Sequence, residues 1–348
     1  MKPVFPVLTL FLCAAMVQAS SKNDKPEDPN PHSVAISGRT LTAQQVAEME
    51  AAIAQHPDDL TTRTKLLGYY FMFRHTSADA KEGGRKHVLW IIKNHPEAEI
   101  AGTPFCMIDA ITDTDGFHDA KQLWLDQTKA HPKDAAIIGH AARFLSIHDR
   151  DTAKDLLKQA RSLEPKNPEW SDQLGHWYSR GGDREGAIKA LAEFELAQAN
   201  DTSDLSKFSR LDYLAKSAFD AQDFDKASQY AEALLKTGEQ NSKNWNFGNT
   251  VNHGNIILGR IALKKGDTKK ADEYLLKAGQ TPGSPQLDSF GPNMSLAKEL
   301  LEAGEKETVL QYFQLCRKFW KSGDTRLDDW TKEVKAGVVP QFGANLVY

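Results

Sequence analysis

Four side chains that can carry positive charge recur in one register of the sequence and could together hold an anion. Each directly follows a glycine or alanine in a similar run of apolar residues, namely His176, Lys216, Arg260 and Lys298. An arginine can grip a carboxylate through two parallel hydrogen bonds, and a lysine attracts it as a point charge. If repeated helical units place these residues in one row, the row predicts binding of a carboxylate or an acidic peptide. Phe219, one turn beyond Lys216, would add an apolar contact.

Acidic residues near this row support a second interpretation. They stand close in sequence to the four basic positions and are Asp172, Asp212, Asp220 and Glu302. Charged runs on helices are most often solvated surfaces, on which acids and bases cancel. One substitution distinguishes the two interpretations. If the row binds an anionic partner, Arg260→Glu should weaken that binding, which should also weaken with salt, while stability stays nearly unchanged.

The motifs of common catalytic and cofactor sites do not occur in the sequence. It contains no G-x-x-x-x-G-K-[ST] phosphate loop, no H-E-x-x-H or C-x-x-C metal motif and no G-x-S-x-G nucleophile motif. No two of its eleven histidines have the i, i+4 spacing of helical metal ligands. We therefore expect no metal, no cofactor and no enzymatic activity. An enzyme that uses His176 or His253 as an acid or base is the alternative, since a fold by itself excludes no activity.

The segment from Asn244 to Asn255 is a second candidate ligand surface. Trp245, Phe247 and His253 supply rings there, with asparagine amides between them. Exposed rings and amides could contact a ligand, but large rings more often pack in a core. We therefore expect this segment mainly to pack at the start of a long helix.

The elements that would position all these residues are paired helices. From Thr42 to Ala336 the pattern is helical, with Gly, Asp or Pro at intervals of roughly 15 to 20 residues. Within it, small and large apolar residues recur around a Gly-Asp turn. The clearest copy contains Trp170, Leu174, Gly175, Tyr178, Gly182, Asp183, Ala187, Leu191 and Phe194. Related copies place their turns at His148–Asp149, Gln222–Asp223, Gly266–Asp267 and Gly304–Glu305.

This pattern resembles the tetratricopeptide repeat over roughly residues 58–318. The resemblance implies an all-α fold, a superhelical solenoid of antiparallel helix pairs in which the first helix of each pair lines a concave groove. The residue after each small position would face that groove, which places the four basic residues along it. The family's peptide-carboxylate clamp does not carry over, because Tyr69 stands where that clamp needs an asparagine.

The two ends of the chain differ from the repeats. Residues 1–19 join Lys2 to an apolar run that ends in small residues, which predicts a secretory signal peptide cleaved after Ala19. Residues 20–41, rich in Ser, Asn, Lys and Pro, predict a flexible linker. The repeat domain would cover 42–336, and residues 337–348 would form an extended C-terminal tail.

Composition and charge narrow the function classes further. The formal net charge is −4 with both signs interspersed, whereas nucleic-acid binders usually carry a strongly basic domain. After residue 20, no apolar run is long enough to span a membrane. Once the signal is removed, Cys106 and Cys316 remain. We expect both to be unpaired, since distant units of a repeat array do not meet.

Together these features predict an exported scaffold, periplasmic or secreted, that binds a protein or peptide. The basic row makes an acidic protein or peptide the candidate partner. The alternatives are an enzyme sited in the same groove, or a structural spacer in an envelope assembly. The Pro-rich segment before Thr42 favours the spacer, because it reads as a tether.

Overall fold

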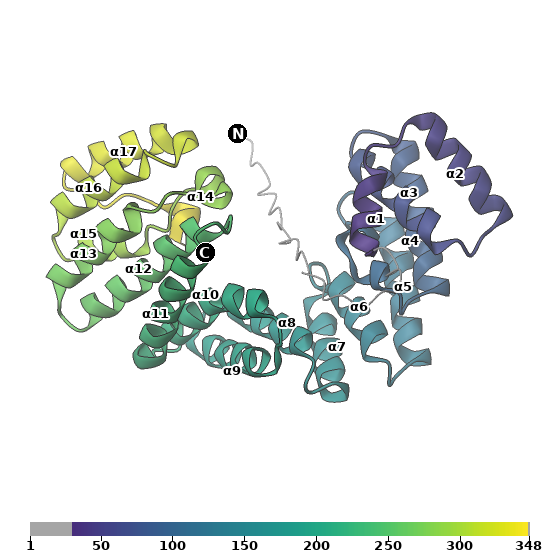
Figure 1. The fold of residues 1–348 in the computed structure, drawn as a ribbon, viewed down its shortest axis with the longest axis horizontal. Helices are drawn as coiled ribbons and strands as arrows, with labels where there is room; N and C mark the ends of the chain where they lie inside the picture. Colours follow the sequence, from purple (N-terminus) through teal and green to yellow (C-terminus); the bar gives the residue numbers. More distant parts are fainter. Residues whose placement is uncertain (1–29, 347–348) are drawn as a thin grey trace. The chain divides into compact units, whose positions relative to one another are not determined.

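The computed structural model describes residues 30–346, which consist of helices joined by turns without any strand (Figure 1). The all-α prediction is therefore confirmed for this range. The described residues divide into two compact units, 30–84 and 85–346. The predicted signal peptide lies outside the described residues. No helix of the described range is long and apolar enough to cross a membrane.

The first unit holds three helices and the start of a fourth. They are α1 (Pro31–Gly38), α2 (Ala43–Gln55), α3 (Leu60–Phe73) and α4 (Ala78–Asn94), which continues into the second unit. Thr42 and Gln45 form the capping box expected from their spacing, each side chain bonding the other's backbone N–H at the start of α2.

Helix α1 occupies Pro31–Gly38 within the segment 20–41 that the sequence predicts as a flexible linker, of which residues 20–29 lie outside the described range. Asn30 caps this helix by accepting two backbone N–H groups, and Pro31 occupies the first turn, where its missing N–H costs nothing. The helix packs on α3 with backbones in direct contact. A Cβ on Gly68 would lie 1.7 Å from the carbonyl oxygen of Ala35, so only glycine allows this crossing.

The second unit contains the repeated helix pairs. Its elements are η1 (Glu99–Gly102), η2 (Pro104–Cys106), α5 (Thr114–Ala130), α6 (Ala135–Leu145), α7 (Arg150–Leu163), α8 (Pro168–Ser179), α9 (Arg184–Asn200), α10 (Asp204–Asp220), α11 (Phe224–Gln240), α12 (Phe247–Lys264), α13 (Thr268–Gly279), α14 (Pro285–Phe290), α15 (Ser295–Glu302), α16 (Lys306–Cys316), η3 (Lys321–Gly323), α17 (Asp324–Lys335) and η4 (Gly343–Leu346). Consecutive helices pack together as α6 with α7, α8 with α9, α10 with α11, α12 with α13 and α15 with α16. We call α6, α8, α10, α12 and α15 the first helices.

The turns inside these pairs follow the predicted Gly-Asp design. An aspartate caps the second helix by accepting the backbone N–H three residues on; these caps are Asp149, Asp183, Asp223 and Asp267. A residue with positive φ precedes the second helix of four pairs; these residues are Gly182, Gln222, Gly266 and Gly304. Gly175 shows why the crossings need small residues, since a Cβ there would lie 2.6 Å from the ring of Phe194.

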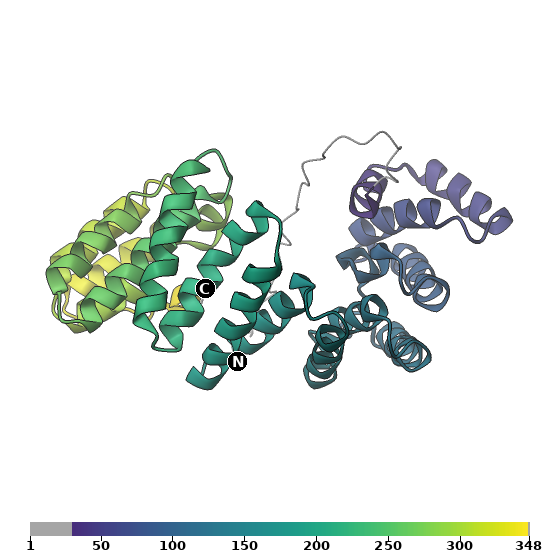
Figure 2. The same ribbon diagram turned by 60° about the horizontal axis from the view of Figure 1, so that its bottom comes forward.

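The C-terminal helices share one core with the chain's end. Figures 1 and 2 show the green-to-yellow helices from α12 onward gathered side by side. Short α14 lies between α13 and α15, with Ser284 as its N-cap and Pro285 in its first turn. The predicted extended tail has no α-helix, but it is packed rather than free: Phe342 stacks edge-on against Trp330, and Asn345 donates to two backbone carbonyls of the 290–292 turn. Cys106 and Cys316 are both buried and free, as predicted.

Candidate functional site

The predicted basic row lies on four successive first helices. His176 is on α8, Lys216 on α10, Arg260 on α12 and Lys298 on α15. The small residue before each of them is buried: Gly175, Ala215, Gly259 and Ala297. The structure thus gives the four residues equivalent places on their helices, but it also gives each of them an acidic neighbour.

Lys216 and Lys298 are half-buried, and their side chains are the most accessible of the row. Lys216 Nζ lies 2.6 Å from Asp220 Oδ2, and Lys298 Nζ lies 3.1 Å from Glu302 Oε1. Each pair joins residues one turn apart on the same helix. The two lysine side chains are 45% and 42% exposed. Such i, i+4 surface pairs stabilise by only about 0.3–0.5 kcal/mol. Either lysine can therefore exchange its partner for a ligand anion at little cost.

Arg260 is held far more firmly. Its Nε and Nη2 donate to one oxygen of Glu299 on α15, at 2.9 and 2.7 Å, and the two side chains are only 24% and 20% exposed. Its guanidinium carbon also lies 4.2 Å from the centre of the Phe219 ring. Arg260 therefore links two first helices, and its remaining freedom to bind a ligand is small.

Phe219 does not offer the apolar surface that the sequence suggested. The residue is 7% exposed, because its ring lies under Arg260 and against Phe224. Phe219, three residues beyond Lys216, thus lies on the buried side of α10, whereas Asp220 beside it is exposed. The apolar group that does reach the surface near the row is Tyr213, which is 44% exposed.

His176 forms a small aromatic and acidic cluster with Tyr213. The two rings meet edge to face with centres 4.4 Å apart, and Tyr213 also stacks on Phe194. His176 Nε2 lies 3.6 Å from Asp172, a charge contact rather than a hydrogen bond. Partial burial, followed by the nearby carboxylates Asp212 and Asp172, raises the pKa of Tyr213 to about 12. Its hydroxyl therefore stays protonated and can donate to a ligand.

A second set of ion pairs connects each first helix to the next. Its members are Arg143–Glu169 between α6 and α8, Arg210–Asp172 between α8 and α10, His253–Asp212 between α10 and α12, and Arg260–Glu299 between α12 and α15. We call these the first-helix ion pairs. Only one of the four bases, Arg260, belongs to the predicted row. The partners lie 26 to 41 residues apart in sequence, so no local spacing reveals them.

Arg210 and His253 are the buried bases of this set. Arg210 donates to Asp172, Gln198 and Asp201 and is 6% exposed. Burial alone would raise the pKa of Asp172, but His176 and Arg210 outweigh it and lower that pKa. Burial likewise opposes the charge on His253, yet the negative charge of Asp212 and the 2.6 Å contact to it raise the histidine's pKa.

The asparagine-rich start of α12 is mainly packing, as expected. Asn249 and Asn252 are buried, and at the start of α14 Asn249 donates to Gln286 and accepts from Ser284. Trp245, before the helix, stays exposed. Among residues 30–346, no group of three or more His, Cys, Asp or Glu side chains could hold a metal ion. His253 is buried against Asp212.

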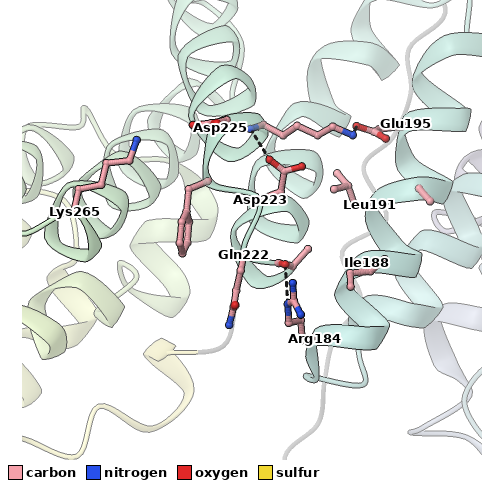
Figure 3. A pocket seen from close by; sticks show the side chains of 12 residues that line it. Arg184, Ile188, Leu191, Glu195, Gln222, Asp223, Asp225 and Lys265 are labelled. Carbon is pink, nitrogen blue, oxygen red and sulfur yellow. Dashed lines mark hydrogen bonds and ion pairs between the residues drawn. The ribbon is translucent and has the colours of Figure 1, made fainter.

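A pocket of about 660 Å³ lies away from the predicted row. Its walls come from α9, the α10–α11 turn, the start of α11 and the end of α12 (Figure 3). Ile188, Leu191 and Phe224 supply apolar surface, and charged side chains surround them. No motif in the sequence predicts this pocket. The one signal is Gln222, which stands in its turn where three other pairs have glycine.

Comparison with known proteins adds no relative. No family model matches the chain, and no curated protein matches it significantly.

Proposed function

We propose that this chain is an exported, tetratricopeptide-like scaffold whose helix pairs stack into a superhelical solenoid. In this proposal the first helices line a concave groove that binds a protein or peptide bearing acidic groups. The direct contacts would come from Lys216 and Lys298, with His176 beside them, while Arg260 and Phe219 shape the surface from below.

One observation carries this proposal: the two lysines have the most accessible side chains of the row and keep weak partners on their own helices, while Arg210 and Arg260 are tied to a neighbouring first helix. A ligand carboxylate would replace Asp220 or Glu302 without breaking any contact between helices. The first-helix ion pairs would keep the helices in place during that exchange. Association should weaken with added salt, because exposed charges are screened within about 10 Å at 0.1 M ionic strength.

Two further functions stay as alternatives. An enzyme would use His176 or His253; the partly exposed His176, in contact with Asp172 and the Tyr213 ring, is the observation in its favour. A structural spacer in an envelope assembly would need no ligand. Helix α1 leaves little of the proposed tether in the described residues, which weakens the case for it.

The test measures binding of a fluorescent decapeptide rich in glutamate. We expect the double variant Lys216→Glu with Lys298→Glu to lower its affinity about tenfold or more, since each reversal replaces attraction by repulsion. The matched control changes two exposed lysines on second helices, Lys236→Glu with Lys269→Glu, and so alters net charge equally. Equal loss in both double variants would reduce the effect to overall charge and refute the proposed site.

A further inference from the structure

The turn between α10 and α11 keeps an unfavourable backbone. Gln222 has φ +67°, and within residues 30–346 it is the single residue other than glycine with positive φ. The equivalent turn residues of three other pairs are glycines: Gly182, Gly266 and Gly304. In this conformation an L side chain crowds the following carbonyl, which glycine avoids. The sequence thus retains a side chain where glycine would be more stable.

That side chain lines the 660 Å³ pocket described above. Strained residues persist where their side chains serve a function, so the observed strain directs attention to this pocket. A volume of this size falls in the range of ligand sites, which combine apolar walls with a few placed polar groups. Ile188, Leu191, Ala192 and Phe224 form the apolar part.

The cations of the pocket are unequally used. Lys226 Nζ contacts Glu195 at 2.7 Å, and Tyr230 donates to the same oxygen, so this pair is satisfied. Arg184 instead donates its Nε to the Ala221 carbonyl at 3.1 Å and forms no ion pair with any acid of residues 30–346. The exposed Arg184 side chain is therefore anchored through Nε, and its terminal nitrogens can turn toward a ligand.

The acidic side chains of the pocket lie mostly away from Arg184, so an anion could bind at the Arg184 end. Asp223 caps α11 by accepting the Lys226 N–H. Figure 3 shows Arg184 and Gln222 at one end of the pocket, with Asp225 and Glu195 at the opposite end. A ligand with one carboxylate would find donors at the first end, whereas a polyacidic ligand would meet repulsion at the second.

We propose that this pocket binds a single carboxylate joined to an apolar group, as in the last residue of a peptide. Arg184 and the Gln222 amide hold the carboxylate, and Ile188, Leu191 and Phe224 hold the apolar group. The site shares no residue with the predicted basic row and takes a different ligand, so it stands whether or not the proposed function holds.

The probe is the peptide Gly-Gly-Gly-Leu-Phe with a fluorescent label at its N-terminus. Its C-terminal amide tests the need for a carboxylate, and the amide extended by one glutamate tests whether a side-chain carboxylate suffices. We expect the free acid to bind and the simple amide to bind at least about tenfold more weakly, the usual loss for one charge-assisted hydrogen bond. Equal binding of acid and simple amide, or no saturable binding of any peptide up to about 1 mM, would overturn the proposal.

Two variants and their controls separate binding from folding. Arg184→Gln should weaken binding of the free acid about tenfold, while Arg326→Gln, an exposed arginine on α17, should not. Gln222→Gly should weaken binding yet raise the melting temperature by about 2–4 °C, because it relieves the strain. Gly304→Gln puts the same side chain into an equivalent turn with φ +97° and should lower the melting temperature without affecting binding. Wild-type affinity in both Arg184→Gln and Gln222→Gly would refute the site.

Discussion

Removing Arg260 should destabilise the protein far more than removing its row neighbour Lys298. Arg260 gives two hydrogen bonds to one oxygen of Glu299 and covers the Phe219 ring. The other Glu299 oxygen is buried and accepts no hydrogen bond within the described residues. Truncation of Arg260 would therefore leave a largely buried carboxylate without its counter-charge.

The magnitude lies between two limits. Exposed pairs contribute about 0–1 kcal/mol, whereas breaking a fully buried pair costs about 3–5 kcal/mol. With the Arg260 and Glu299 side chains 24% and 20% exposed, we expect Arg260→Ala to cost about 2–3 kcal/mol, which includes the lost contact with the Phe219 ring. Lys298→Ala breaks only an i, i+4 surface pair and should cost about 0.5 kcal/mol or less.

Urea unfolding followed by circular dichroism measures both free energies. A double-mutant cycle with Glu299→Ala should return a coupling energy of about 1–2 kcal/mol, since the two side chains share one contact. The reasoning fails if Arg260→Ala costs no more than Lys298→Ala, or if the coupling energy is zero. The same contact also revises the sequence-based expectation for Arg260→Glu, which would set two carboxylates against each other and lower stability as well as binding.

Three other changes test separate parts of the structure. Asp212 raises the pKa of His253 above 6.5 despite burial, so stability present below pH 6.5 should be lost as pH rises through the folded-state pKa; urea unfolding should show this loss in the wild type and not in His253→Gln. Ala187→Leu should overfill the buried α8–α9 crossing and cost about 1–3 kcal/mol, and an unchanged melting temperature would contradict that packing. Prepared from residue 20 onward, which leaves out Cys13, the unreduced protein should expose two thiols, Cys106 and Cys316, only on denaturation; fewer would reveal a disulfide.

The helix pairs and their turns could be predicted because they depend on local patterns. Gly175 must be small where Phe194 crosses it, and Asp183 must cap the helix that follows it, so both leave a signature at fixed spacing. The same local reasoning placed His176, Lys216, Arg260 and Lys298 at equivalent positions on their helices.

The ion-pair partners and the burial of those residues could not be predicted, because both depend on the offset between neighbouring helices. Glu299 and Arg260 are 39 residues apart in sequence. They meet only because α12 and α15 lie side by side. Phe219 stands near the boundary between the exposed and buried sides of α10, where one turn decides its exposure. The Pro-rich composition of residues 20–41 favours a linker, but Pro31 follows the Asn30 cap and begins a helix, and the close contact at Gly68 holds that helix in place.

The central claim, that the exposed side of the first helices binds an acidic peptide, is tested most directly by hydroxyl-radical footprinting. Tyr213 is exposed beside His176 on that side, whereas Trp245 is exposed before α12 and outside the proposed contact. With saturating glutamate-rich peptide, we predict that oxidation of Tyr213 falls while oxidation of Trp245 stays constant. If the peptide binds and the oxidation of Tyr213 does not change, the ligand lies elsewhere and the account is contradicted.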